Sequence, residues 1–245
     1  MKYILIFILT IFSNTIFSQE KITEVIYKKK STLNLNEKQN KFSQAAPQSN
    51  YLVKSAYEKM QSIEYKLFFN NKESYFEMVK SLDTDNQKGN VSKLLAESLG
   101  IGNGNYYANI ESKKLVHQKE FTSDLFYIES STNNHIWKLN NNTKKIGNYN
   151  CYEATTITSL ETVRGSKEIP VTAWYTTDIP LPFGPANFTN LPGLILELHL
   201  NNVIVYADAI NLNKKGDIKV PKKGIKITEQ EFVKLQKDGF SKYKN

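Results

Sequence analysis

One stretch of the chain, from Ala173 to Glu197, is rich in hydrophobic residues and in residues that restrict the backbone, yet it holds few side chains that carry out catalysis. The restricting residues are four prolines and two glycines: Pro180, Pro182, Pro185, Pro192, Gly184 and Gly193. Each proline fixes φ and lacks an N–H, whereas each glycine permits positive φ. We therefore predict a stiff, ordered loop between two strands.

The end of this stretch also predicts a tight turn. In Leu191-Pro192-Gly193-Leu194, proline and glycine occupy the second and third positions that a type II turn favours. The third position of such a turn requires positive φ. We therefore expect the chain to reverse sharply here, with Gly193 in the left-handed region.

Elsewhere, hydrophobic residues recur at every second position in short runs that end in turn residues. The two clearest runs are Ile63 to Phe69 and Leu194 to Leu200, and Asn-Asn follows both of them. Asparagine tolerates the positive φ of two-residue turns, so each run predicts the first strand of a hairpin. The predicted strands are 22–27, 63–69, 74–79, 106–110, 115–121, 125–129, 136–139, 145–158, 171–176, 194–200 and 203–210.

Helical patterns are few. A short helix is predicted over Val91 to Leu99, ended by Gly100, and the polar stretch Ser31 to Asn50 is predicted to be a long loop. Near the C-terminus, Thr228 to Glu231 forms a capping box, and Gly239 offers a stop. The pattern predicts a mainly β (α+β) fold. We expect a single curved antiparallel sheet of about 8–10 strands with hairpins, a proline-rich ordered loop and a short C-terminal helix.

The start of the chain predicts export. A basic residue precedes an apolar run from Tyr3 to Phe12, and the small residue Ser18 follows it. The run is too short to cross roughly 30 Å of hydrocarbon, and the pattern is that of a signal peptide. We predict a signal peptide over 1–18 and one β-rich domain over 19–245. A retained amphipathic anchor is the alternative.

Export sets the expected location of the mature chain. No cysteine follows the apolar run, which disfavours a lipoprotein anchor, and no second long apolar run predicts a transmembrane span. We expect a periplasmic, outer-membrane-associated or extracellular protein. An envelope or outer-membrane protein is its expected partner, and an apolar ligand is the alternative.

The basic balance of the chain does not predict nucleic acid as a partner. Lysine and arginine number 32 against 24 acidic residues, a net charge of +8. Arg164 is the only arginine, so the chain is poor in the planar group that makes bidentate contacts to phosphate and guanine. Most lysines are scattered, which favours a solvated, mildly cationic surface.

Residues that could carry chemistry are sparse, and we predict no catalytic residue, cofactor or metal ion. Cys151, the only cysteine, lies in an alternating strand pattern without a cation beside it, which favours a buried side chain over a nucleophile. His199 and Glu197 share a strand face; a metal pair is the alternative to a solvated face. Asp178 precedes Ile179-Pro180, where a turn residue is favoured over a general base.

Four aromatic residues lie within the opening stretch: Trp174, Tyr175, Phe183 and Phe188. They could line a groove for a peptide, a lipid chain or a glycan, or they could close one end of the core. We favour the core for the set as a whole. Individually, Trp174 is expected to be a core residue because it lies in a predicted strand, and Phe183 is the favoured contact because it lies in the loop.

Residues from Trp137 to Leu198 resemble the GLPGLI family of exported bacterial proteins, a family without an assigned function. The matching residues are Trp137 to Leu139, Lys145 to Tyr149, Cys151, Ala154, Gly165, Ala173 to Thr176, Ile179, Pro180, Phe183 to Pro185 and Leu191 to Glu197. Asn190 replaces the first glycine of the signature, and asparagine can also adopt positive φ. The resemblance implies export and fold rather than activity.

The family motif and its flanks form the candidate contact loop of the sequence. Its residues are Trp174, Tyr175, Pro180, Phe183, Gly184, Pro185, Phe188, Leu191, Pro192, Gly193, Leu194 and Ile195. Three functions are consistent with it. An exported, non-catalytic envelope binding or accessory protein, serving outer-membrane transport or assembly, is favoured; a periplasmic carrier of a lipid or other apolar ligand and a hydrolase with a noncontiguous site are the alternatives.

We predict that the mature chain begins at Gln19 or one residue later, because Ser18 suits the position before signal-peptide cleavage. N-terminal sequencing of the protein recovered from the envelope or the medium tests this. An intact Met1 or a lipid-modified terminus would contradict it.

Overall fold

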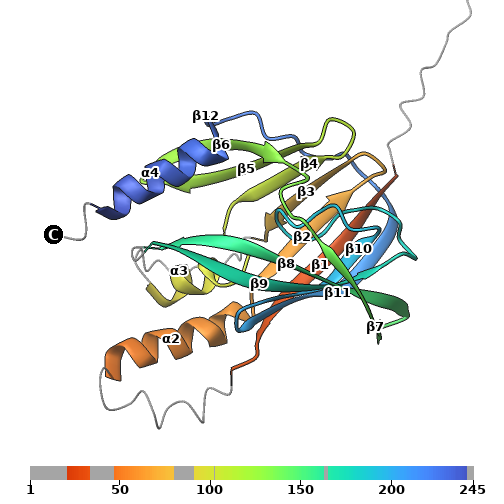
Figure 1. Ribbon diagram of the computed structural model, residues 1–245, viewed down its shortest axis with the longest axis horizontal. Coiled ribbons are helices and arrows are strands. Elements are labelled where there is room, and N and C mark those ends of the chain that lie inside the picture. Colours follow the sequence, from red (N-terminus) through yellow and green to blue (C-terminus); the bar gives the residue numbers. More distant parts are fainter. Residues whose placement is uncertain (1–20, 34–46, 80–90, 102, 163–164, 242–245) are drawn as a thin grey trace, which may run out of the picture.

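The computed structural model describes residues 21–33, 47–79, 91–101, 103–162 and 165–241. Within these ranges, twelve strands form one strongly curved sheet (Figure 1). The strands are β1 (Lys21–Ser31), β2 (Glu64–Phe69), β3 (Glu73–Met78), β4 (Asn105–Asn109), β5 (Lys114–Phe121), β6 (Asp124–Ser131), β7 (Lys138–Ile146), β8 (Tyr149–Thr162), β9 (Gly165–Thr176), β10 (Leu194–Leu200), β11 (Val203–Lys215) and β12 (Ile225–Thr228). The predicted signal peptide lies outside the described residues.

The sheet consists of two meanders joined at its centre. Its order is β12-β6-β5-β4-β3-β2-β1-β11-β10-β9-β8-β7, so β1 to β6 run outward on one side and β11 to β7 on the other. Every described neighbouring pair is antiparallel except β12 with β6, which is parallel. The mainly β class is confirmed. The sheet is larger than expected partly because β12, a mostly exposed strand of only four residues, was not among the predicted strands.

Three helices accompany the sheet in the described ranges: α2 (Pro47–Met60), α3 (Val91–Ser98) and α4 (Glu229–Ser241). None of them is long and apolar enough to cross a membrane. The capping box of α4 is confirmed, since Thr228 N donates to Glu231 Oε2 and Glu231 N donates to Thr228 Oγ1. The stop predicted at Gly239 is wrong, because the helix continues to Ser241.

Helix α2 corrects the predicted long loop. The loop was expected over Ser31 to Asn50, but β1 extends to Ser31 and α2 begins at Pro47; residues 34–46 lie outside the described part. The hydrophobic pattern of α2 is weak because only a few of its side chains pack against the core. Ala56, Tyr57 and Met60 are buried against the core, whereas most of its other described side chains are at least partly exposed.

The concave face of the sheet is filled by the chain itself. Residues 177–193, which we call the proline loop, lie on this face and bring the ring of Phe183 to 5.5 Å from that of Phe69. Phe183 has no exposed surface. The Tyr27 hydroxyl donates to the carbonyl of Ile195 at 2.6 Å, which ties the end of the loop to the centre of the sheet. The predicted stiff loop is therefore a core element.

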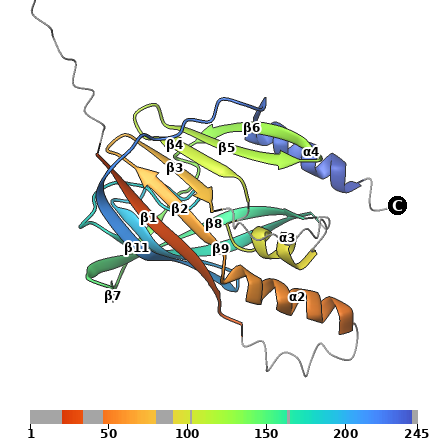
Figure 2. The same cartoon turned by 180° about the vertical axis from the view of Figure 1, so that it is seen from behind.

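The opposite face of the sheet is covered near one edge by residues 216–224. Figure 2 shows this segment passing from β11 towards β12. Along the way, Lys219 Nζ donates to Glu77 on β3 at 2.9 Å, and Gln118 Nε2 on β5 donates to the carbonyl of Lys223 at 2.9 Å. The segment thus carries the chain from the middle of the sheet to its far edge.

A buried lysine holds α3 against the sheet. Lys29 on β1 is 1% exposed, and its Nζ donates to the carbonyls of Ala96 at 3.1 Å and Leu99 at 2.8 Å. These carbonyls lie at the C-terminal end of α3, where the helix dipole favours a cation. Burial lowers the pKa of Lys29 to about 7, opposed by the charge of Glu97. The short helix and its end at Gly100, which has φ of 78°, are confirmed.

The turns follow the sequence in part. Asn201, in the β10–β11 hairpin, and Asn190 have positive φ, 51° and 71° respectively, as asparagine permits. Asn70, in the β2–β3 hairpin, instead accepts hydrogen bonds from the backbone N–H of Lys72 and Glu73 through Oδ1. Gly193 does not have positive φ, so the type II turn is wrong. The glycine is required because a Cβ there would lie 1.9 Å from the carbonyl oxygen of Thr176.

Gly193→Ala should therefore destabilise the protein by about 1–3 kcal/mol or more, since the added methyl group forces the backbones of two segments apart. The matched control is Gly239→Ala in α4, where the new Cβ would meet its nearest neighbour at 3.6 Å. Because alanine favours a helix over glycine by about 1 kcal/mol, this change should be neutral or stabilising. Chemical denaturation measures both. Equal stabilities of the two variants would contradict the close contact.

Candidate functional site

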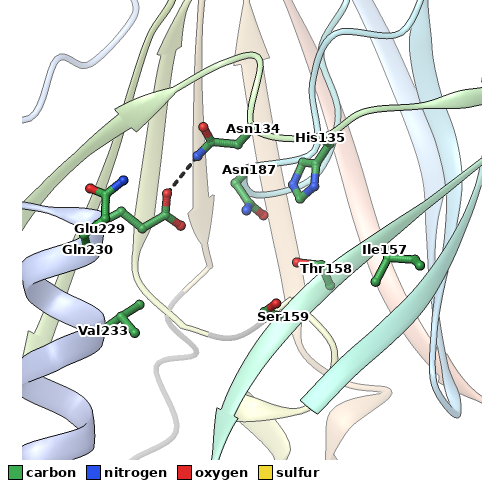
Figure 3. Close-up of a pocket in the computed structure, with 9 residues that line it drawn as sticks. All are labelled: Asn134, His135, Ile157, Thr158, Ser159, Asn187, Glu229, Gln230 and Val233. Atoms are coloured by element: carbon green, nitrogen blue, oxygen red, sulfur yellow. Dashed lines mark hydrogen bonds between the residues drawn. The ribbon is translucent and has the colours of Figure 1, made fainter. Parts of the chain in front are cut away.

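A cleft of about 470 Å³ lies between α4 and β8, on the open side of the curved sheet (Figure 3). Nine residues from four separate parts of the chain line it: Asn134, His135, Ile157, Thr158, Ser159, Asn187, Glu229, Gln230 and Val233. Its volume falls within the range of roughly 300–1,000 Å³ that is usual for small-molecule sites. The sequence analysis did not predict this set.

The first wall of the cleft is the start of α4. The capping box places Glu229 in the first helical turn, and Phe232 anchors the helix by packing against Phe126 at 5.4 Å between ring centroids. Asn134 Nδ2 donates to Glu229 Oε2 at 2.8 Å across one end of the cleft (Figure 3). Burial of the carboxyl group raises the pKa of Glu229, and the hydrogen bond from Asn134 partly opposes the rise.

The second wall is the 132–137 segment, which connects β6 to β7. His135 is 6% exposed and stacks on Phe188 with 4.6 Å between ring centroids. Its Nε2 is buried and has no hydrogen-bond partner among the described residues. Burial lowers the pKa of His135 to about 4, so the imidazole is neutral near pH 7. A neutral imidazole can donate from one nitrogen and accept at the other.

The proline loop fixes the position of this second wall. Thr189 Oγ1 donates to the carbonyl of Thr132 at 2.8 Å, and Trp137 Nε1 donates to the carbonyl of Thr189 at 2.8 Å. Phe188 supports the ring of His135 from the same loop. Asn187 lines the cleft directly, and Figure 3 shows it between His135 and α4. The loop therefore contributes to the cleft mainly by supporting it.

The third wall is β8, which contributes the hydroxyl groups of Thr158 and Ser159 and the aliphatic side chain of Ile157. Ile157 is 61% exposed and lies at the rim. Thr156, one residue earlier, donates from Oγ1 to the carbonyl of Ile136 at 2.8 Å, which joins β8 to the second wall. The cleft is therefore bounded by elements that are hydrogen-bonded to one another.

The candidate contact loop of the sequence is mostly interior. Its buried members are Tyr175, Phe183, Gly184, Pro185, Phe188, Leu191, Gly193, Leu194 and Ile195, whereas Pro180 and Pro192 are exposed. The choice of Phe183 as a contact is wrong, because its ring packs inside the curved sheet. The interpretation that the aromatic residues close one end of the core is correct for Tyr175, Phe183 and Phe188, which are all buried.

Trp174 differs from the other aromatic residues of the loop and its flanks. It is partly buried at the edge of the core, and Lys144 Nζ lies 4.3 Å from the centroid of its ring. Lys144 also donates to Glu197 Oε1 at 2.5 Å, and His199 Nε2 lies 2.5 Å from the same oxygen. Trp174 was expected to be a core residue, and this is only partly correct. Its ring is only partly buried, and the charged group of Lys144 lies over it.

The other residues that the sequence analysis considered for chemistry have structural roles in the fold. Cys151 is fully buried, and burial raises the pKa of its thiol to about 11, which confirms the prediction of a buried side chain. His117 stacks on Tyr106 at 4.0 Å. Asp178 is exposed, and its backbone N–H donates to Thr176 Oγ1 in a turn. Among the described residues, no group of three or more His, Cys, Asp or Glu could hold a metal ion.

The cleft could not be predicted from the sequence, because its walls come from segments that lie far apart in the chain. Asn134, Thr158 and Asn187 belong to types that are common in turns and on strand surfaces, and no spacing links them. The one local signal was the capping box, which placed the start of α4 but not what it faces. His135 was visible only as an isolated histidine.

The comparisons with known proteins agree with the fold and leave the activity open. Two crystal structures of PNGF-II, in space groups C2 and P21, match with TM-scores of 0.53 and 0.54 at 14% sequence identity. The matches cover 90% and 88% of this chain but 32% and 33% of the PNGF-II chains, so this chain spans about a third of their length. At this identity the likeness concerns the fold.

A family model also matches part of the chain. The family is described as "Protein of unknown function (Porph_ging)", and the match covers residues 160–197. This range includes the end of β8, all of β9, the whole proline loop and the start of β10. The matched range therefore contains the loop that supports the cleft. No curated protein matches the chain.

The burial of His135 predicts a loss of stability in acid. Between its ordinary pKa of 6.5 and its folded pKa of about 4, the unfolded chain binds a proton that the folded chain does not, so stability falls as the pH falls through this window. His135→Phe keeps a ring on Phe188 and cannot titrate. Between pH 7 and pH 4, the free energy of unfolding of His135→Phe should therefore fall by up to about 3 kcal/mol less than that of the wild type.

Urea denaturation of both proteins across this pH range measures the difference, and the other titrating groups are common to both. Parallel pH profiles would contradict a buried, neutral His135.

Proposed function

We propose that the chain is an exported, non-catalytic envelope binding or accessory protein that recognises its partner through the α4–β8 cleft. The signal-like start and the resemblance to the GLPGLI family support export to the periplasm or the outer membrane. The accessory role in transport or assembly at that membrane is proposed from the sequence, which contains no recognised catalytic motif. The family match over 160–197 fits this assignment, because it contains the loop that holds one wall of the cleft.

The observation that carries the proposal is the unpaired Nε2 of His135 at a polar cleft. A buried polar atom without a hydrogen bond is rare, because it forfeits its interaction with water. Such an atom needs an explanation, and a bound partner that supplies the missing hydrogen bond is one. The other lining side chains are mostly amides and hydroxyls, which can donate and accept hydrogen bonds to a bound partner.

The carrier alternative has less support. A carrier of an apolar ligand needs an apolar cavity, and the concave face of this sheet is occupied by its own side chains. Phe183, Leu194 and Leu198 are 0% exposed there, and Phe69 and Leu67 are 1% exposed. Figure 1 shows helices and loops across the same side. The proline loop takes the place that an apolar ligand would occupy.

The hydrolase alternative also has less support, although the cleft contains His135, Glu229 and Ser159. A serine nucleophile is activated by a hydrogen bond to a base. His135 Nε2 has no such bond to any described residue, and the Glu229 carboxyl group is bonded to Asn134. The arrangement therefore favours binding.

Site-directed photocrosslinking tests the proposal. The native Cys151 is fully buried with its thiol pKa raised to about 11, so a cysteine introduced at Ser159 is the reactive thiol. A thiol-linked benzophenone at Ser159→Cys should capture envelope material on irradiation. The control is Asn148→Cys, an exposed residue in the turn at the opposite end of β8.

We expect a discrete adduct from Ser159→Cys that is absent from Asn148→Cys. The same adducts from both positions, or none from either, would contradict recognition at the cleft.

A further inference from the structure

We infer that the ligand of the α4–β8 cleft is a neutral, hydroxyl-rich molecule, a saccharide, that hydrogen-bonds to the buried imidazole of His135. This inference rests on the proposed function, since it names the chemical class that the same cleft recognises. It follows from which donors and acceptors line the cleft, from which charges are missing, and from how the polar and aliphatic side chains are distributed.

The donors and acceptors of the cleft match closely spaced hydroxyl groups. Asn134, Asn187 and Gln230 each offer a carboxamide with donors and an acceptor, and Thr158 and Ser159 offer hydroxyls that do both. A sugar hydroxyl likewise donates one hydrogen bond and accepts others. A ligand with hydroxyls on adjacent carbons can therefore satisfy several of these groups at once.

The charges of the cleft disfavour an ionic ligand. None of the nine lining residues is lysine or arginine, so an anion would meet Glu229 without a compensating cation. A cation would find one carboxyl group, whose pKa is raised by burial and which already accepts a hydrogen bond from Asn134. A neutral ligand is neither repelled by Glu229 nor dependent on it for charge compensation.

His135 gives the cleft its selectivity. Its side chain is more than nine-tenths buried, and Figure 3 shows the ring extending from the 132–137 segment towards Asn187 and the cleft. The ring is held by stacking on Phe188 and stays neutral near pH 7, so it can bond to a hydroxyl as donor or acceptor. A site that bonds a hydroxyl discriminates strongly against ligands that lack it.

The aliphatic residues complete the match. Ile157 on β8 and Val233 on α4 line the cleft from separate walls beside the polar groups. A pyranose ring presents hydroxyls at its edge and C–H groups on its faces, so it can bond to the amides and hydroxyls while its faces contact these side chains. A fully polar cleft would offer no such surface.

Titration calorimetry at pH 7 with four neutral probes tests the inference: maltotriose, cellotriose, mannotriose and N,N′-diacetylchitobiose. We expect at least one of them to bind the full mature chain, and His135→Phe to weaken that binding at least tenfold. His117→Phe is the matched control, since it removes another desolvated imidazole of the same sheet that does not line the cleft. It should bind as the wild type does.

A second variant covers the case in which His135→Phe fails to fold. Thr158→Val removes one lining hydroxyl with little change in shape, and it should weaken the same saccharide several-fold while the midpoint of denaturation stays close to that of the wild type.

Failure of all four saccharides to bind, or binding that His135→Phe and Thr158→Val leave unchanged, would overturn the inference. If Ser159→Cys still gives its specific adduct in that case, the cleft remains a binding site and only the ligand class is wrong. If the adduct consists of a peptide without sugar, the ligand is a polypeptide and the saccharide assignment fails.

Discussion

The packing of the proline loop into the concave face of the sheet is the interaction on which the rest of the structure depends. A curved sheet of two meanders leaves a large apolar inner surface, and one loop covers much of it. Phe183 fills the centre, and the backbone bonds from Leu194 N to the carbonyl of Ile179 and from Ile195 N to that of Phe183 hold the loop in place. The absence of a side chain at Gly193 lets the loop approach β9.

This packing also supports the cleft that we propose as the binding site. The loop fills the interior of the described sheet, and the cleft lies beyond it, between α4 and β8. The same loop supports that space, since Thr189 bonds to both ends of the 132–137 segment and Phe188 supports His135. The proline loop lacks catalytic residues, but it can still contribute to the proposed function by holding the 132–137 wall of the cleft in place.

Local patterns predicted the local structure. The alternation in Leu194 to Leu200 and the capping box at Thr228 gave a strand and a helix because neighbouring residues alone decide them. The sequence could not place Phe183, since a loop aromatic is a contact or a core residue according to what it faces. The reason for Gly193 was also non-local, because the atom that excludes a side chain belongs to Thr176. The cleft joins four distant segments, and the sequence predicted the start of α4, through its capping box, but not that these segments meet.

Native-state hydrogen exchange tests the central claim that the proline loop is a permanent part of the core. The backbone N–H groups of Phe183, Leu194 and Ile195 should exchange only through global unfolding, with the same free energy as the central strands β1 and β11. Exchange of these three amides through a local opening, at a free energy well below that of the strands, would contradict the account. The loop would then be a lid, and the concave face would be a ligand cavity.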